Sequence, residues 1–249
     1  MPDLDVDVPT PDGSAASSLH VPEGDGPWPG VIMYPDAGGT RDVFRSMGGR
    51  LASYGYVVLV PDIYYRAGGY EPFSMSTVFT DPDERQRLGA LAGSLTPERV
   101  ADDAIAFAGF LQGRPEVADG PIGTTGYCLG GRLSLTVAGL LGERVGAAAS
   151  FHGGRLAVED DPASPHHRAD EVRATVYVAG AEHDASFDDE QAERLGSAYR
   201  AAGAAGVACT IETYAGAHGF AVPDNPTFDE AAAERHWSAM STLFAAALR

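Results

Sequence analysis

Short apolar runs alternate along most of the chain with segments in which apolar residues recur at helical spacing. An apolar run bounded by turn residues predicts a buried strand, and apolar positions three or four residues apart predict a helix packed on one side. The predicted strands are 29–36, 56–64, 120–128, 145–153, 174–180 and 207–214. The predicted helices are 41–55, 96–111, 129–142, 187–203 and 228–248. This succession predicts an α/β fold, a mainly parallel sheet flanked by helices on both faces.

Two segments depart from this pattern. Residues 3–22 alternate apolar and polar positions on both sides of the turn sequence TPDG, which predicts an N-terminal antiparallel hairpin at the edge of the sheet. Residues 64–95 are mixed in polarity and include only a short stretch compatible with a helix. Long loops are often functional, so this segment is either a lid or a surface excursion. Since no linker or repeat interrupts the chain, 1–249 is predicted to be a single domain.

The charge balance narrows the partners. The chain has 17 basic and 35 acidic residues, a net charge of −18 with neutral histidines, which disfavours binding to nucleic acid or a membrane surface. It has no signal-peptide pattern and no apolar run of membrane-spanning length, so we expect a cytoplasmic protein. The two cysteines cannot form a disulfide framework, and no metal site or cofactor is expected. The expected partner is a small-molecule substrate, and the expected state is a monomer or weak homo-oligomer.

The segment TTGYCLGGRL at 124–133 is the most informative. It places Cys128 between glycines where a predicted strand passes into a predicted helix. Nucleophiles are presented on such turns, which glycines flank because a Cβ would clash with nearby backbone. The following helix start favours a thiolate and a developing oxyanion. Cys128 is therefore either a nucleophile or a small core residue. The backbone N–H groups of Leu129 and Ala37 are the expected oxyanion hole.

A cysteine nucleophile needs a base and an acid that orients the base. Asp184 follows strand 174–180, and His218 lies in a glycine-rich loop after strand 207–214. Functional groups of α/β sheets gather at the carboxyl ends of strands, and the order nucleophile, acid, histidine is that of α/β-hydrolase triads. We expect a neutral His218 to act as the base, with activity rising as the imidazole loses its proton. His152, after another strand, is a candidate for lining the pocket.

Two further side chains have alternative interpretations. Asp36 follows strand 29–36 beside the expected position of the nucleophile. Its carboxylate either caps local structure or holds the thiol proton until substrate arrives. Cys209 lies in an alternating stretch and is expected to be a small buried residue.

The motifs GYCLGG, GAEHD, AGAHGF and DPDERQR together resemble the dienelactone hydrolase family, a cysteine-dependent group of α/β hydrolases, over nearly the whole chain. The resemblance implies the α/β-hydrolase fold and a triad of Cys128, Asp184 and His218. It also implies hydrolysis of a small ester or lactone through an acyl thioester, which water attacks with His218 as general base. In that family a glutamate at the position of Asp36 contacts the resting thiol, and Asp36 is one methylene shorter.

The resemblance also concerns substrate binding, because dienelactone enzymes of the family hold the substrate carboxylate with two arginines. Arg87 matches the first arginine, and Val222 occupies the position of the second. Loss of one of two anion contacts is enough to change substrate preference. We therefore expect ester or lactone hydrolysis, leave open whether a dienelactone is accepted, and consider Arg66 as a replacement from the opposite side.

Two other functions are compatible with the sequence. A cysteine-elbow amidotransferase or deglycase-like enzyme also places its cysteine between glycines. Such enzymes pair the histidine with a downstream carboxylate, here Asp224, whereas the better acid, Asp184, lies upstream. A non-catalytic small-molecule-binding protein would keep Cys128 as a buried thiol. Rapid modification of Cys128 by iodoacetamide would count against that alternative.

Overall fold

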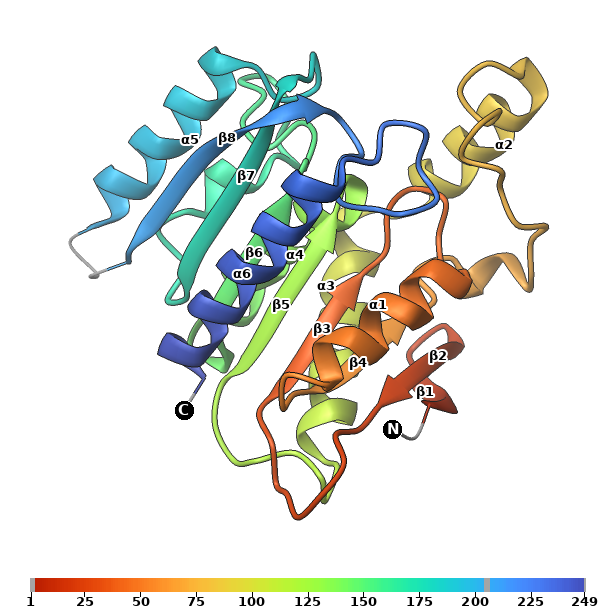
Figure 1. Cartoon of the computed structure of the whole chain (residues 1–249), viewed down its shortest axis with the longest axis vertical. Helices are drawn as coiled ribbons and strands as arrows, with labels where there is room; N and C mark the ends of the chain where they lie inside the picture. Colours follow the sequence, from red (N-terminus) through yellow and green to blue (C-terminus); the bar gives the residue numbers. More distant parts are fainter. Residues whose placement is uncertain (1–2, 204–206, 249) are drawn as a thin grey trace.

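The computed structural model describes residues 3–203 and 207–248, in which strands and helices alternate largely as predicted (Figure 1). The strands are β1 (Asp3–Thr10), β2 (Gly13–His20), β3 (Gly30–Tyr34), β4 (Val57–Pro61), β5 (Ile122–Tyr127), β6 (Val145–Phe151), β7 (Thr175–His183) and β8 (Cys209–Ala217). The α-helices are α1 (Asp42–Ala52), α2 (Pro82–Gly93), α3 (Pro97–Gln112), α4 (Leu129–Leu141), α5 (Asp189–Ala202) and α6 (Glu230–Ala247). Short 3-10 helices are η1 (Tyr65–Ala67), η2 (Gly142–Arg144) and η3 (Pro165–Arg168).

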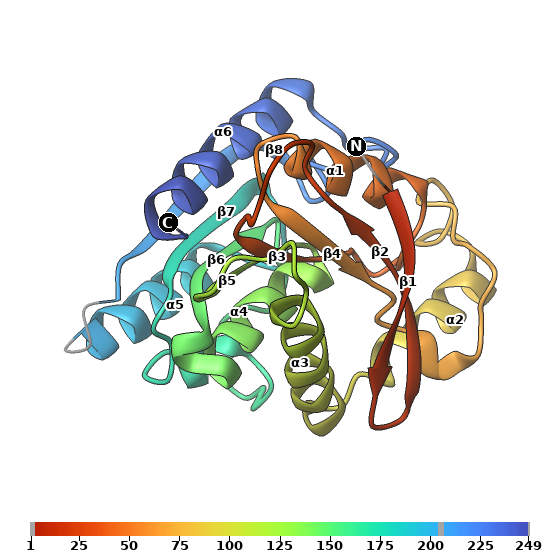
Figure 2. The ribbon, with the colours of Figure 1, turned by 90° about the horizontal axis from the view of Figure 1, so that it is seen from below.

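The described strands form one 8-stranded sheet in the order β1-β2-β4-β3-β5-β6-β7-β8. β1 and β2 form the predicted antiparallel hairpin at one edge, with Thr10 opposite Gly13 at the turn. β2 pairs antiparallel with β4, and all later neighbours in this order are parallel. Helices lie on both faces of the twisted sheet (Figure 2). The predicted mainly parallel α/β architecture with an antiparallel edge hairpin is confirmed.

Each face of the sheet has its own apolar core. On one face, α1 and α6 contribute buried side chains such as Met47 and Trp237. On the other face, α3, α4 and α5 contribute Phe107, Leu135 and Leu195. Burial of one large apolar side chain stabilises the fold by about 1.5–3 kcal/mol. These two cores hold the helices against the sheet and thereby fix the loops at the strand ends.

The segment 64–95 lies at the end of the molecule where the parallel strands have their carboxyl ends (Figure 1). Only a short helical stretch is predicted there, whereas α2 has 12 residues. The helix begins where the Asp81 side chain accepts hydrogen bonds from two N–H groups of the first turn, with Pro82 as the first helical residue. Leu88 of α2 packs in a small separate apolar cluster with Phe73. Within 3–203 and 207–248, no helix is both long and apolar enough to cross a membrane.

Candidate active site

Cys128 lies on the tight turn between β5 and α4. Its backbone has φ 53° and ψ −116°, a conformation with positive φ that residues other than glycine seldom adopt. Such backbone strain costs on the order of 1–3 kcal/mol and persists only where the surrounding structure enforces it. Here the Cys128 N–H donates to the Phe151 carbonyl of β6 over 3.1 Å. A Cβ on Gly126 or Gly130 would overlap neighbouring backbone atoms, so the turn requires glycine at both positions.

Asp184 and His218 meet just beyond the ends of β7 and β8. His218 Nδ1 lies 2.7 Å from Asp184 Oδ2, and the Asp184 side chain is 2% exposed. The other carboxylate oxygen, Oδ1, accepts hydrogen bonds from the Ser186 N–H at 2.8 Å and from its hydroxyl at 2.6 Å. Burial raises the pKa of Asp184, but the hydrogen bonds from His218 and Ser186 outweigh it, so the pKa is lowered and the carboxylate stays ionised. Asp224, the alternative acid, pairs instead with Arg41.

The Cys128 thiol interacts with the same imidazole. Burial lowers the pKa of His218, but the charge of the Cys128 thiolate and the hydrogen bond to Asp184 outweigh burial and raise the pKa to about 10. The raised pKa favours the protonated imidazolium at neutral pH. That a neutral His218 acts as the base stays a prediction, and it concerns the step after the imidazolium has given up its proton. In the resting site the imidazolium is an acid, and it becomes a base only after giving its proton away.

Cys128, Asp184 and His218 line one cavity of about 650 Å³. This volume is in the range of small-molecule sites, roughly 300–1,000 Å³. Met75 and Phe79 from the segment 64–95 form part of its wall, and Phe79 is 52% exposed. The long segment is therefore a wall of the cavity, which favours the interpretation as a lid over that of a surface excursion.

The two expected oxyanion-hole residues, Leu129 and Ala37, also line this cavity. Leu129 is the first residue of α4, where helix N–H groups lack partners within the helix. The Ala37 carbonyl accepts a hydrogen bond from the Tyr64 hydroxyl at 3.0 Å. That bond fixes the orientation of the loop that follows β3. Both residues therefore lie at the cavity that contains Cys128, and their role as the oxyanion hole stays a prediction.

The Asp36 carboxylate anchors the loop between β3 and α1. Its two oxygens accept hydrogen bonds from the Arg41 guanidinium at 2.7 and 2.8 Å, and Oδ1 also accepts from the Gly38 N–H at 2.9 Å. Arg41 in turn pairs with Asp224, in the loop after β8. Asp36 is buried and is absent from the cavity lining. These contacts favour the structural interpretation of Asp36.

The arginines considered for substrate binding lie outside the cavity lining. Arg87, on α2, pairs with Glu84 over 2.7 Å, and its guanidinium stacks on an aromatic ring of the same segment. Arg66 forms two hydrogen bonds with the buried Asp103 carboxylate. Val222 is fully buried in the core. Because these cations are engaged elsewhere, the structure gives no support to Arg87 or Arg66 as a substrate clamp.

Two other arginines line the cavity, and sequence reasoning missed both. Arg132 lies on α4, one turn beyond Cys128, and Arg155 lies in the loop after β6. Both donate to the same Asp161 oxygen, each over 2.9 Å. The Arg155 side chain is 58% exposed. Two guanidinium groups facing one carboxylate leave one excess positive charge at the wall. The spacing of four residues from Cys128 was a signal for Arg132, whereas Arg155 had none.

His152 lies beneath the site rather than in the cavity lining, which corrects the expectation for this residue. It is 1% exposed, and its ring centre lies 5.1 Å from that of His218 and 5.0 Å from that of Phe220, both in edge-to-face geometry. Neither of its ring nitrogens has a hydrogen-bond partner in the described part of the chain. Burial holds the pKa of His152 well below its usual range, so the ring stays neutral.

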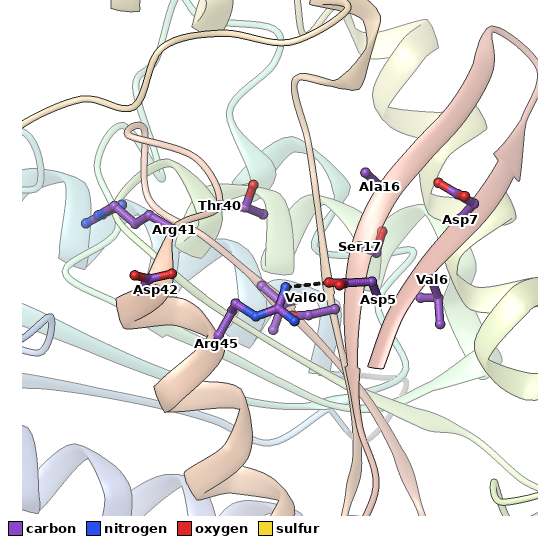
Figure 3. A pocket seen from close by; sticks show the side chains of 11 residues that line it. Asp5, Val6, Asp7, Ala16, Ser17, Thr40, Arg41, Asp42, Arg45 and Val60 are labelled. Carbon is purple, nitrogen blue, oxygen red and sulfur yellow. Dashed lines mark hydrogen bonds and ion pairs between the residues drawn. The ribbon is translucent and has the colours of Figure 1, made fainter. Parts of the chain in front are cut away.

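A different cavity, of about 380 Å³, lies between the N-terminal hairpin and the start of α1 (Figure 3). Arg45 extends across it and pairs with Asp5 over 2.8 Å. This cavity shares no lining residue with the cavity at Cys128. The triad candidates therefore belong to a separate site at the carboxyl ends of the strands.

Comparisons with known proteins agree with this fold. The sequence model of the dienelactone hydrolase family matches residues 16–248. A Synechocystis protein named "Putative carboxymethylenebutenolidase" is 28% identical over 251 residues, covering 98% of this chain and 96% of its own. A Pseudomonas putida carboxymethylenebutenolidase is 28% identical over 135 residues, covering 53% of this chain and 54% of its own.

Solved structures show the same fold. The crystal structure of a dienelactone hydrolase-like promiscuous phosphotriesterase from metagenomic libraries is similar, with a TM-score of 0.79 and 24% identity over 99% of both chains. The predicted α/β-hydrolase fold is thereby confirmed. The chain belongs to the dienelactone hydrolase family, a family of carboxylic ester hydrolases.

Proposed function

We propose that this protein hydrolyses a small ester or lactone through Cys128, His218 and Asp184, with an acyl thioester on Cys128 as intermediate. The observation that carries the proposal is the 2.7 Å contact between His218 Nδ1 and Asp184 Oδ2, in the same cavity as a cysteine on a strained elbow. A buried thiol in a binding protein requires neither this contact nor the strain.

In the first half of the reaction, the Cys128 thiolate attacks the carbonyl carbon of the ester. A bond forms between Sγ and that carbon, and the oxyanion binds the N–H groups of Leu129 and Ala37. The carbon–oxygen bond of the ester then breaks, and the departing alkoxide oxygen takes a proton from His218 to leave as the alcohol. Asp184 stabilises the imidazolium and orients its ring throughout.

In the second half, the now neutral His218 takes a proton from water while the water oxygen attacks the thioester carbonyl. Acylation has removed the thiolate charge, so one of the main causes of the raised pKa of His218 is gone and the imidazole can remain neutral until water arrives. The carbon–sulfur bond breaks, the acid is released, and the thiolate–imidazolium pair forms again.

The intermediate gives a direct test. Mixing the enzyme with 4-nitrophenyl acetate and quenching in acid should give a 1:1 acetyl adduct on Cys128, located by peptide mass spectrometry. Asp184→Asn should acylate more slowly, because its side chain no longer stabilises the imidazolium. Hydrolysis without an adduct on Cys128, or with the adduct on another residue, would refute the proposed nucleophile.

For substrates that carry a carboxylate, we propose Arg155 as the anion contact, because the excess positive charge of the Arg132–Asp161–Arg155 group lies on its exposed side chain. A hydrogen bond to a charged group contributes about 1.5–3 kcal/mol. Arg155→Gln should therefore lower kcat/KM for a carboxylated dienelactone by about 10- to 100-fold and leave a neutral lactone within about threefold. An equal effect on both lactones would exclude Arg155 as the anion contact.

A further inference from the structure

A second, smaller cavity adjoins the active-site cavity. It has a volume of about 150 Å³ and shares two lining residues, Leu129 and Arg132, with the larger one. Leu129 directly follows Cys128, so the small cavity begins next to the proposed nucleophile. We call it the α4 groove.

The α4 groove follows the surface of α4 away from Cys128. Four half-buried residues of α4 line the groove: Leu129, Arg132, Thr136 and Leu140. Their spacing of three or four residues puts them on one stripe of the helix, which at 1.5 Å per residue runs for about 16 Å. The opposite walls come from the C-terminal end of α2, from the start of α3 at Pro97 and Val100, and from residues 162–165.

The lining of the groove is suited to an apolar occupant. Most of its side chains are aliphatic or proline, and the few polar ones already have partners. Arg132 pairs with Asp161 over 2.9 Å, and Arg168 pairs with Glu171 over 2.7 Å.

The two hydroxyl groups of the lining are engaged as well. The Thr136 hydroxyl donates to the Arg132 carbonyl over 2.9 Å, and the Ser164 hydroxyl donates to the Arg155 carbonyl over 2.9 Å. Both hydroxyl protons are therefore already used, and a ligand acceptor would have to break one of these bonds to take a hydroxyl proton. An aliphatic chain leaves them intact and gains by leaving water.

We propose that the α4 groove binds the aliphatic acyl chain of the substrate, which extends from the carbonyl carbon at Cys128 past Leu129 and along α4. The inference rests on the proposed function and assigns its substrate class: esters whose acyl part carries several methylenes. Each methylene that leaves water on entering the groove contributes about 0.8 kcal/mol, which is about fourfold in kcat/KM.

The test uses 4-nitrophenyl acetate, butanoate, hexanoate and octanoate below their solubility limits, and compares ratios of kcat/KM within each protein. In the wild type, the octanoate-to-acetate ratio should be well above one. Thr136→Trp fills the groove from α4 and should lower that ratio by at least tenfold. Ala92→Phe narrows the α4 groove from the opposite wall, on α2, and should also lower the ratio. This variant provides the test if Thr136→Trp does not fold.

Ile105→Trp is the matched control, because Ile105 is 58% exposed on α3 and does not line the groove. It should keep the wild-type ratio. Two results would overturn the acyl-chain assignment even though turnover depends on Cys128. One is an octanoate-to-acetate ratio near one in the wild type, and the other is an unchanged ratio in both Thr136→Trp and Ala92→Phe. Turnover that does not depend on Cys128 would instead refute the proposed function.

Discussion

At the residue scale, the chemistry depends on the charge state that Cys128 and His218 share. The pKa of His218 is raised from 6.5 to about 10, so the imidazolium persists through neutral pH and is lost only as the pH approaches that value. We therefore expect the His218 imidazolium to serve as the acid of acylation from neutral to mildly alkaline pH. Acylation should lose this acid near pH 10.

The first prediction concerns alkylation of Cys128. In the wild type, iodoacetamide should modify Cys128 rapidly at pH 7, because the imidazolium stabilises the thiolate. A thiol without a cationic partner titrates near pH 8.5, so only a few per cent is thiolate at pH 7. His218→Ala should lower the alkylation rate at pH 7 by tenfold or more and move the midpoint of its pH dependence upward. Cys209 is an internal control, since burial raises its pKa to about 12.

An unchanged rate in His218→Ala would mean that the thiol owes its reactivity to another group. Preferential labelling of Cys209 would contradict the assignment of the nucleophile outright.

The second prediction concerns His152, which packs edge-to-face against His218. His152→Phe keeps an aromatic ring there and removes two buried nitrogens that lack partners in the described residues, so it should be at least as stable as the wild type and keep kcat within about threefold. His152→Ala leaves a cavity beneath His218 and should destabilise the fold by about 2 kcal/mol or more. It should also lower kcat by about tenfold with little change in KM. A large loss of kcat in His152→Phe would show that a ring nitrogen, rather than packing, is required.

The residues of the site differ in how far the sequence could predict them. The positions of Cys128, Asp184 and His218 were predictable because each follows a recognisable strand, and parallel strands present their carboxyl ends at one edge. Arg155 was not predictable, since it lies in an irregular loop whose path depends on its contact with Asp161. The burial of His152 depends on rings from other strands and loops, which no local pattern reveals.

At the element scale, the strand–turn–helix of β5 and α4 is the unit that presents the nucleophile. A Cβ on Gly130 would overlap the carbonyls of Tyr34 and Pro35, at the end of β3. The close approach of α4 to β3 therefore sets the position of Cys128.

The third prediction follows from this close approach. Gly130→Ala should destabilise the protein by about 1–3 kcal/mol and abolish most turnover, because α4 must shift away from β3. Gly109→Ala is the matched control on α3, where an added Cβ has no neighbour within 4 Å. Gly109→Ala should be neutral or stabilise the protein by up to about 1 kcal/mol, since alanine has a higher helix propensity than glycine. Chemical denaturation and ester turnover measure both effects, and a fully active, stable Gly130→Ala would contradict the packing.

The elements themselves were predictable where periodicity was strong. The hairpin β1–β2 and the helices α1, α4 and α6 were expected from their patterns. The full length of α2 was not, because few of its side chains are buried and its apolar pattern is weak. Its cap, Asp81 followed by Pro82, was the local signal that marks its start.

At the scale of the whole molecule, ion pairs tie distant loops around the site. The Arg41 guanidinium bridges Asp36, after β3, and Asp224, after β8. These loops come from opposite ends of the sequence and flank the cavity. This contact joins the two halves of the chain near the site.

The fourth prediction tests the single domain expected for 1–249. Trp28 packs against the core on one face of the sheet, and Trp237 belongs to the core on the other. If the two cores unfold together, the fluorescence of Trp28→Phe and of Trp237→Phe should each change at the same denaturant concentration as the circular dichroism of the same variant. Two separate midpoints within one variant would show that the two faces unfold as independent units.

Covalent catalysis by Cys128 is tested by steady-state hydrolysis with the wild type and with Cys128→Ala. The substrates are 4-nitrophenyl acetate, a neutral lactone and a carboxylated dienelactone. We predict turnover of at least one substrate by the wild type and a loss of at least a thousandfold in Cys128→Ala, with the far-UV circular dichroism unchanged. Equal turnover by folded Cys128→Ala, or none by the wild type on any of the three, would contradict it.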